Sequence, residues 1–168
     1  MYVNLIFLAM FIGYSTGIAP IVSYHLGAGN TDEMKSLFKK SRGIILISSV
    51  SMCLLAEVLA KPLSAVFVGY DQTLFEMTRH AFIVYSLSFL FSGVGIFGSA
   101  FFTALNDGTT SAFISFLRTL VFQTAMVLLL PRIFELDGIW ISIVAAEGLA
   151  ALVTVVFLLA KKHRFHYL

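Results

Sequence analysis

Long apolar segments alternate with short polar joints along the whole chain. Five segments stand out, over residues 3–27, 43–61, 80–106, 109–131 and 138–160. Each is close to the ~20 residues that a helix needs to cross ~30 Å of hydrocarbon. The joint Asn106-Asp107-Gly108 is a strong turn signal between the third and the fourth segment. The pattern predicts an all-α membrane protein with five transmembrane helices.

The joint after the first segment has a helical pattern of its own. Met34, Leu37 and Phe38 recur at the spacing of one helix face, and lysines occupy the other face. This pattern predicts an interfacial amphipathic helix over residues 32–42, with its apolar side among the lipid headgroups. A solvated, charged linker is the alternative.

The composition supports a membrane protein. The chain has 168 residues, of which 59% are hydrophobic and 12% are charged. A soluble domain is about 25% charged, so this chain could not cover its surface with polar groups. The net charge of +2 is too small to indicate a nucleic-acid partner. The single cysteine, Cys53, excludes an internal disulfide and reads as a small buried side chain.

Basic residues are distributed unequally between the two ends of the predicted helices. Seven basic residues lie in joints on one side of the membrane, and three lie in joints on the other side. The seven are Lys35, Lys39, Lys40, Arg42, Lys161, Lys162 and Arg164, and the three are Lys61, Arg79 and Arg132. The positive-inside rule therefore predicts a cytoplasmic C-terminus and, with five spans, an extracytoplasmic N-terminus. A charge-free start on the outside suggests a chain that begins within a larger protein.

Small and polar side chains form stripes at helical spacing on three of the segments. The candidates for lining a cavity are Thr16, Pro20, Tyr24, Tyr85, Ser88, Ser92, Ser99 and Gln123. Such stripes are either packing seams between helices or the walls of a water-filled cavity. Pro20 frees the carbonyl group of Thr16 and predicts a bend in the first helix that faces other helices.

Three charged residues fall inside the apolar segments, where a charge costs at least ~2.5–3.5 kcal/mol. Glu57 precedes Lys61 by four residues, which predicts an ion pair near the membrane interface. Arg118 and Glu147 lie deeper, on consecutive segments joined by a short loop, so we expect them to form a pair. The pair is either a fixed tie between two helices or a site where Glu147 exchanges a proton.

The chain carries no sequence motif of a known catalytic site. The patterns H-E-x-x-H, G-x-S-x-G and G-x-x-x-x-G-K are absent, and His25 has no second histidine nearby. We therefore do not expect an enzyme, a metal site or an organic cofactor.

An ordered set of motifs identifies a family. The first segment ends in GIAPIVSYHLGAGN, from Gly17 to Asn30, and a basic stretch follows it. The later motifs are Lys61-Pro62-Leu63 with Val66-Phe67, Phe101 to Gly108, Ser115 to Arg118, Leu130-Pro131, Gly138-Ile139-Trp140 and Ala146-Glu147. In type, order and spacing this set resembles the multidrug and toxic compound extrusion (MATE) family over nearly the whole chain.

The resemblance implies a partial transporter. Members of the family have twelve helices in two lobes, and this chain corresponds to the last five. The implied function is antiport of amphiphilic or cationic drugs and toxic compounds out of the cell, coupled to protons or sodium, with Glu147, Arg118 and Glu57 as candidates for transport or ion coupling. The implied partners are the lipid bilayer of the cell membrane, a small amphiphilic substrate and the missing N-terminal lobe. The alternatives are a lipid-linked oligosaccharide flippase of the same superfamily and an inactive truncated fragment.

Overall fold

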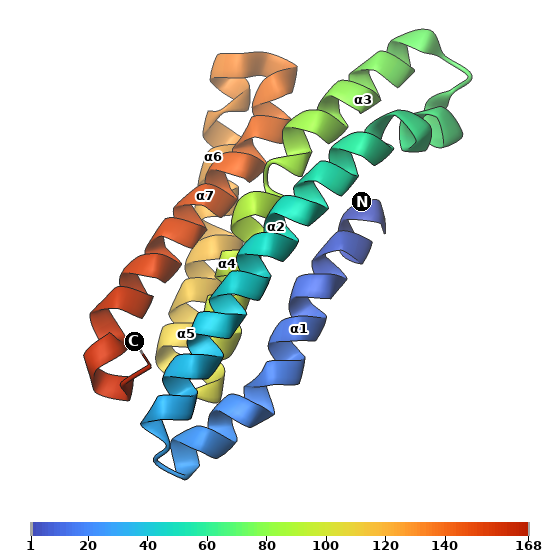
Figure 1. The fold of residues 1–168 in the computed structure, drawn as a ribbon. Helices are drawn as coiled ribbons and strands as arrows, with labels where there is room; N and C mark the ends of the chain where they lie inside the picture. The colour runs from blue at the N-terminus through green and yellow to red at the C-terminus, as the bar shows by residue number, and fades with distance from the viewer. Residues whose placement is uncertain (1, 168) are drawn as a thin grey trace.

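A computed structural model describes residues 2–167, and within them it contains helices and no strands (Figure 1). The all-α prediction is confirmed. The helices are α1 (Tyr2–Gly27), α2 (Thr31–Val68), α3 (Gln72–Ser86), α4 (Phe89–Ala104), α5 (Gly108–Phe116), the π-helix η1 (Leu117–Phe122), α6 (Gln123–Leu129) and α7 (Pro131–Phe165). The α1–α2 turn and the C-terminus lie at one end of the bundle, and the α2–α3 and α6–α7 turns lie at the other (Figure 1).

The helices suit a membrane in length and composition. Among the described residues, four helical stretches are long and apolar enough to cross: Asn4–Gly27, Thr31–Val68, Gly108–Leu129 and Pro131–Phe165. Helices α3 and α4 form a pair bent by 44°, and this pair makes a fifth span if it is counted as one. The count of five spans therefore stays a prediction.

The expected interfacial helix over residues 32–42 is not a separate element. Helix α2 runs without interruption from Thr31 to Val68 and joins it to the second apolar segment. The apolar face found in the sequence packs on protein rather than on headgroups. Met34 and Phe38 are buried, and the Phe38 ring centroid lies 5.1 Å from that of Phe101 and 5.0 Å from that of Tyr167. These partners hold the first turns of α2 against the bundle.

The third segment begins earlier than residue 80 and is broken in the middle. Asp71 caps α3, since its carboxylate accepts hydrogen bonds from the backbone N–H groups of Thr73 and Leu74. The helix stops at Ser86, and α4 starts at Phe89. The two parts meet at the 44° bend, so this span changes direction inside the bundle.

Helix α4 occupies the centre of the bundle, where it packs against α1, α2, α5 and α7. Glycines allow these close contacts. A Cβ atom at Gly98 would lie 2.1 Å from Cγ2 of Thr154 on α7, and one at Gly93 would lie 2.6 Å from Oγ of Ser49 on α2. The backbone of α4 therefore touches two neighbouring helices directly.

The end of α7 is tied to the turn between α4 and α5. Asp107 caps α5, and its Oδ2 atom lies 2.5 Å from Nζ of Lys161. Burial raises the pKa of Asp107, but the hydrogen bonds from Lys161 and Thr110 outweigh it and leave the pKa below its usual range. The chain then folds back, and the Tyr167 hydroxyl group donates to the Leu158 carbonyl group at 2.7 Å.

Candidate functional site

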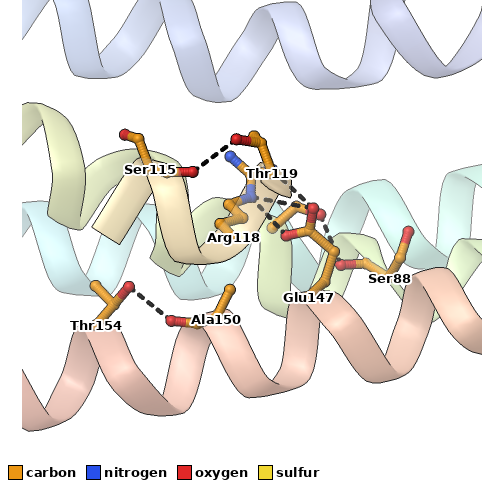
Figure 2. A network of polar contacts seen from close by, with 8 residues as sticks. Ser88, Ser115, Arg118, Thr119, Glu147, Ala150 and Thr154 are labelled. Atoms are coloured by element: carbon orange, nitrogen blue, oxygen red, sulfur yellow. Dashed lines mark hydrogen bonds and ion pairs between the residues drawn. The ribbon is translucent and has the colours of Figure 1, made fainter. Parts of the chain in front are cut away.

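Arg118 on η1 and Glu147 on α7 form the predicted ion pair (Figure 2). Nε of Arg118 lies 3.1 Å and 3.0 Å from the two carboxylate oxygens, and a terminal guanidinium nitrogen lies 2.9 Å from Oε1. The side chains are only 17% and 16% exposed. A guanidinium group that donates to both carboxylate oxygens fixes the orientation of both groups as well as their distance.

The turn that carries Arg118 is unusual. Residues Leu117–Phe122 form a π-helix between two α-helical stretches of the same span. Such π-helical insertions are rare, and they occur frequently at functional sites. On the facing helix, a Cβ atom at Gly95 would lie 3.4 Å from Cδ of Arg118, so the glycine leaves room for the arginine stem.

The ion pair lies on the wall of a cavity of about 620 Å³ inside the bundle. Helices α1, α3, α4, η1, α6 and α7 contribute side chains to this cavity, which we call the main cavity, and α2 contributes Ala56. Its aromatic side chains include Phe82, Tyr85 and Trp140. The main cavity therefore combines an apolar, aromatic wall with one buried pair of charges, which suits a flat organic molecule with a polar or charged group.

A second, smaller cavity of about 320 Å³ is lined by the arginine of this pair and not by the glutamate. Leu8, Arg118 and Thr119 line both cavities. Three serines form a connected set at the smaller cavity. Oγ of Ser99 lies 2.8 Å from Oγ of Ser115, which also lines the cavity, and 3.0 Å from Oγ of Ser111, which does not. Arg118 thus lies between the main cavity, where it pairs with Glu147, and a smaller cavity lined by hydroxyl groups.

The cavity-lining candidates on α3, α4 and α6 fall into three groups. Tyr85 and Gln123 line the main cavity, and Ser99 lines the smaller one. Ser88 and Ser92 line neither cavity, contrary to the expectation from the stripe. Both are 2% exposed, and the Ser92 hydroxyl group donates to the Ser88 carbonyl group at 2.9 Å. Both residues lie at the start of α4, directly after the bend, where this helix packs against its neighbours.

The candidates on α1 point away from the rest of the described bundle. Thr16, Pro20 and Tyr24 are exposed and line neither of these two cavities, so their role in lining a cavity stays a prediction. A Cβ atom at Gly13 or Gly17 would meet nothing within 4 Å, so the stripe is not a packing seam among these residues either. Helix α1 packs through its opposite face, which carries Phe7 and Phe11. The α-helix is continuous through Pro20, and the expected bend there stays a prediction.

Glu57 does not form the ion pair with Lys61 that the spacing suggested. Within residues 2–167, none of the ion pairs closer than 4.0 Å includes Glu57. Its Oε1 atom instead lies 3.8 Å from Sγ of Cys53 and 3.5 Å from Oγ of Ser86. The carboxyl group turns inward, toward the break between α3 and α4, while Lys61 is exposed.

Sequence reasoning missed two polar groups of the main cavity. Oδ1 of Asn4 is buried without a hydrogen-bond partner among the described residues, and Trp140 lines the same cavity. Asn4 is the one amide side chain of the first apolar segment, residues 3–27, which was a usable signal. Among the described residues, no three His, Cys, Asp or Glu side chains gather to hold a metal ion.

Comparison with known proteins decides the family. The MatE family model matches residues 1–129, which is more than half of the chain. The chain belongs to the MATE family. The resemblance of the sequence motifs is thereby confirmed. Among curated proteins, the search finds no match.

A solved structure agrees with this MATE assignment. The chain resembles the outward-facing conformation of a multidrug resistance MATE family transporter of the MOP superfamily, with a TM-score of 0.88 and 17% sequence identity. The likeness covers 96% of this chain and 37% of that one, so the chain spans about a third of the length of the transporter it matches. At this identity the likeness shows the fold, which is that of a multi-pass membrane protein.

Proposed function

We propose that this chain is the C-terminal part of an exporter that moves amphiphilic or cationic small molecules out of the cell by antiport against protons or sodium. The observation that carries the proposal is the buried Arg118–Glu147 pair on the wall of the main cavity. A volume of about 620 Å³ lies within the range of small-molecule sites, ~300–1,000 Å³. The aromatic wall matches the apolar part of such a substrate, and aromatic faces also attract cations.

The ion pair supports a mechanism for coupling. Arg118 neutralises Glu147 while the cavity is empty of cations. A proton or a sodium ion on Glu147 would compete with the guanidinium group, and so would a cationic substrate. Binding of the coupling ion and binding of the substrate would then exclude each other at one carboxylate, which is the requirement for antiport. Because Arg118 lies in the π-helical turn, it has a local structure that can rearrange when it loses its partner.

Transport itself would require the rest of the protein. Alternating access needs two halves that move about a site between them. The open stripe of Thr16, Pro20 and Tyr24 on α1 is the face that we assign to the missing N-terminal lobe.

Binding of a cationic dye tests the function. Trp140 is the single tryptophan and lies on the cavity wall, so its fluorescence reports on an aromatic ligand there. We expect ethidium to quench Trp140 in the purified chain in lipid nanodiscs and Glu147→Gln to weaken binding by ~10-fold, which is ~1.4 kcal/mol. The matched control is Glu33→Gln, because Glu33 is exposed at the start of α2. Equal affinities for the wild type and both variants would contradict the proposal.

The flippase alternative is less well supported by the cavity. A carrier of anionic lipid-linked sugars needs an excess of positive charge around its substrate. Here the arginine of the main cavity is neutralised by Glu147, and the remaining wall is largely apolar.

The orientation in the cell membrane is part of the same proposal. The lysine-rich start of α2 and the C-terminus lie at one end of the bundle, as the charge distribution predicted (Figure 1). We assign this end to the cytoplasm. In a chain with Cys53 replaced by serine, a membrane-impermeant thiol reagent applied outside intact cells should label Asp71→Cys and not Ser36→Cys. Labelling of position 36 alone would reverse the assignment.

A further inference from the structure

Positive charge gathers at one end of the bundle, where α2 starts and α7 ends (Figure 1). This end carries seven lysine and arginine residues against three acidic residues, which are Asp32, Glu33 and Asp107. The other end, around the α2–α3 and α6–α7 turns, carries three basic residues against four acidic ones, which are Asp71, Glu76, Glu135 and Asp137. An excess of positive charge therefore exists at one end only.

The first turns of α2 present part of this charge on a single face. Lys35, Lys39 and Arg42 recur at helical spacing, and all three side chains are exposed. We call these three residues the basic face. The side of the helix that packs on the bundle carries the buried Met34 and Phe38 instead. Like charges three and four residues apart on a helix repel each other, so an anion bound between them would stabilise the helix.

No carboxylate among the described residues supplies this anion. Within residues 2–167, none of the ion pairs closer than 4.0 Å includes a residue of the basic face. Asp32 and Glu33 lie in the first turn of α2 and take part in none of these pairs. Asp107 is engaged by Lys161 of α7. The basic face is thus left to a negatively charged group from outside the bundle.

The end of α7 brings further cations near the basic face. The buried ring of Tyr167 lies 5.0 Å from that of Phe38, centroid to centroid, so the chain returns to the first turns of α2. Just before this contact, Arg164 is exposed and Lys162 is partly exposed. Neither is among the ion pairs of residues 2–167. The positive surface therefore includes two helices that are far apart in the sequence.

An exposed apolar surface begins directly beyond these cations. On α2, Ile44, Leu46 and Ile47 follow the basic face and are exposed. On α7, the exposed Leu159 precedes Lys162 by less than one turn. In a membrane-spanning helix such a surface matches the hydrocarbon of the lipid tails. The cations consequently lie where the apolar surface ends, at the level of the lipid headgroups.

From this arrangement we infer that the basic face of α2, together with Lys162 and Arg164 of α7, binds the headgroups of anionic phospholipids. Clusters of about four to eight lysine and arginine residues next to a membrane span attract such headgroups. An anionic headgroup supplies the negative charge that the chain lacks here, while its acyl chains lie along the apolar surface of α2. A zwitterionic headgroup has no net charge and is attracted less. This interaction does not depend on drug export.

Native mass spectrometry of the 168-residue chain, released from detergent micelles, tests the inference. The probes are phosphatidylglycerol and phosphatidylcholine with identical acyl chains. We expect the wild type to bind phosphatidylglycerol at least ~10-fold more tightly than phosphatidylcholine. Because the attraction is between exposed charges, this preference should shrink as the ammonium acetate concentration is raised. The triple variant Lys35→Gln/Lys39→Gln/Arg42→Gln should lose most of the preference.

A matched control removes the same number of exposed cations from the other end of the bundle. It is the triple variant Lys61→Gln/Arg79→Gln/Arg132→Gln, which should keep the preference for phosphatidylglycerol. Lys35→Arg/Lys39→Arg conserves the charge and should keep it as well. Circular dichroism checks that each variant is helical, and the single variants Lys39→Gln and Lys61→Gln replace a triple variant that does not fold.

Three results would each overturn the inference. The first is an equal affinity of the wild type for the two lipids. The second is an equal loss of the preference in the variants of the two ends, which would mean that net charge alone decides binding. The third is displacement of phosphatidylglycerol by an equal concentration of inorganic phosphate, which would identify a site for a free anion instead of a lipid.

Discussion

The Arg118–Glu147 pair offers a direct measurement of how a buried charge is held in this bundle. The perturbation is a set of three variants: Arg118→Met, Glu147→Met and the double replacement. Three hydrogen bonds of 2.9–3.1 Å join the two side chains, which are 17% and 16% exposed. Removing one partner leaves the other charge buried and uncompensated. We therefore expect each single variant to lower the free energy of unfolding by ~3–5 kcal/mol.

The double variant should behave differently from the sum of the singles. With both charges gone, two methionines of similar length fill the space, and such replacements are often neutral or stabilising by ~1–4 kcal/mol. We expect the double variant to recover most of the stability that either single change removes. Its recovery would show that the cost of the singles comes from an unpaired charge and not from lost packing.

Unfolding in mixed micelles of increasing denaturing-detergent content measures these energies. The fluorescence of Trp140 reports from the same cavity wall, and circular dichroism follows the helices. The reasoning fails if the single variants lie within ~1 kcal/mol of the wild type, or if the effects of the two changes simply add. Additivity would mean that the two side chains act independently despite their contact.

Further predictions concern the packing of α4 and the end of α7. Gly98→Ala would place a methyl group 2.1 Å from the Thr154 side chain and should lower the free energy of unfolding by ~1–3 kcal/mol. The control is Gly148→Ala, which should not destabilise the chain because its methyl group would meet nothing within 4 Å. Equal melting temperatures of the two variants would contradict this prediction. Asp107→Asn removes charge-assisted hydrogen bonds of ~1.5–3 kcal/mol at neutral pH. Because the pKa of Asp107 is lowered in the fold, its contribution to stability is complete above the unfolded pKa of ~3.9 and is lost as the pH falls through the folded pKa. The free energy of unfolding should therefore fall less steeply with decreasing pH in Asp107→Asn than in the wild type. Equal slopes for the two proteins would refute this prediction.

Several elements could be predicted because their signals are local. The ends of α1 and of the Gly108–Leu129 stretch follow the apolar segments closely, since hydropathy and a turn signal act over a few residues. The Arg118–Glu147 pair could be predicted as well. The helices that carry the two residues are consecutive and antiparallel, so their depths follow from residue counts and the rise of a helix.

Other features could not be predicted, because they depend on partners far away in the chain. The apolar face of Met34 and Phe38 has the pattern of a membrane-surface helix, and only its contact with the C-terminal Tyr167 shows that it packs on protein. Spacing placed Glu57 beside Lys61, but the break after Ser86 offers the carboxyl group a different partner.

The sequence alone determined that the chain is a helical membrane protein, its family and the pairing of Arg118 with Glu147, because apolar length, motif order and residue count are properties of the chain itself. The tertiary structure decided which polar side chains meet a cavity. A π-helical turn at Arg118 and a bend before Phe89 rotate the faces of two spans, and a stripe read at constant helical spacing cannot anticipate either change. The stripe on α1 shows the same principle, because it is regular in sequence and yet lies open in the described bundle.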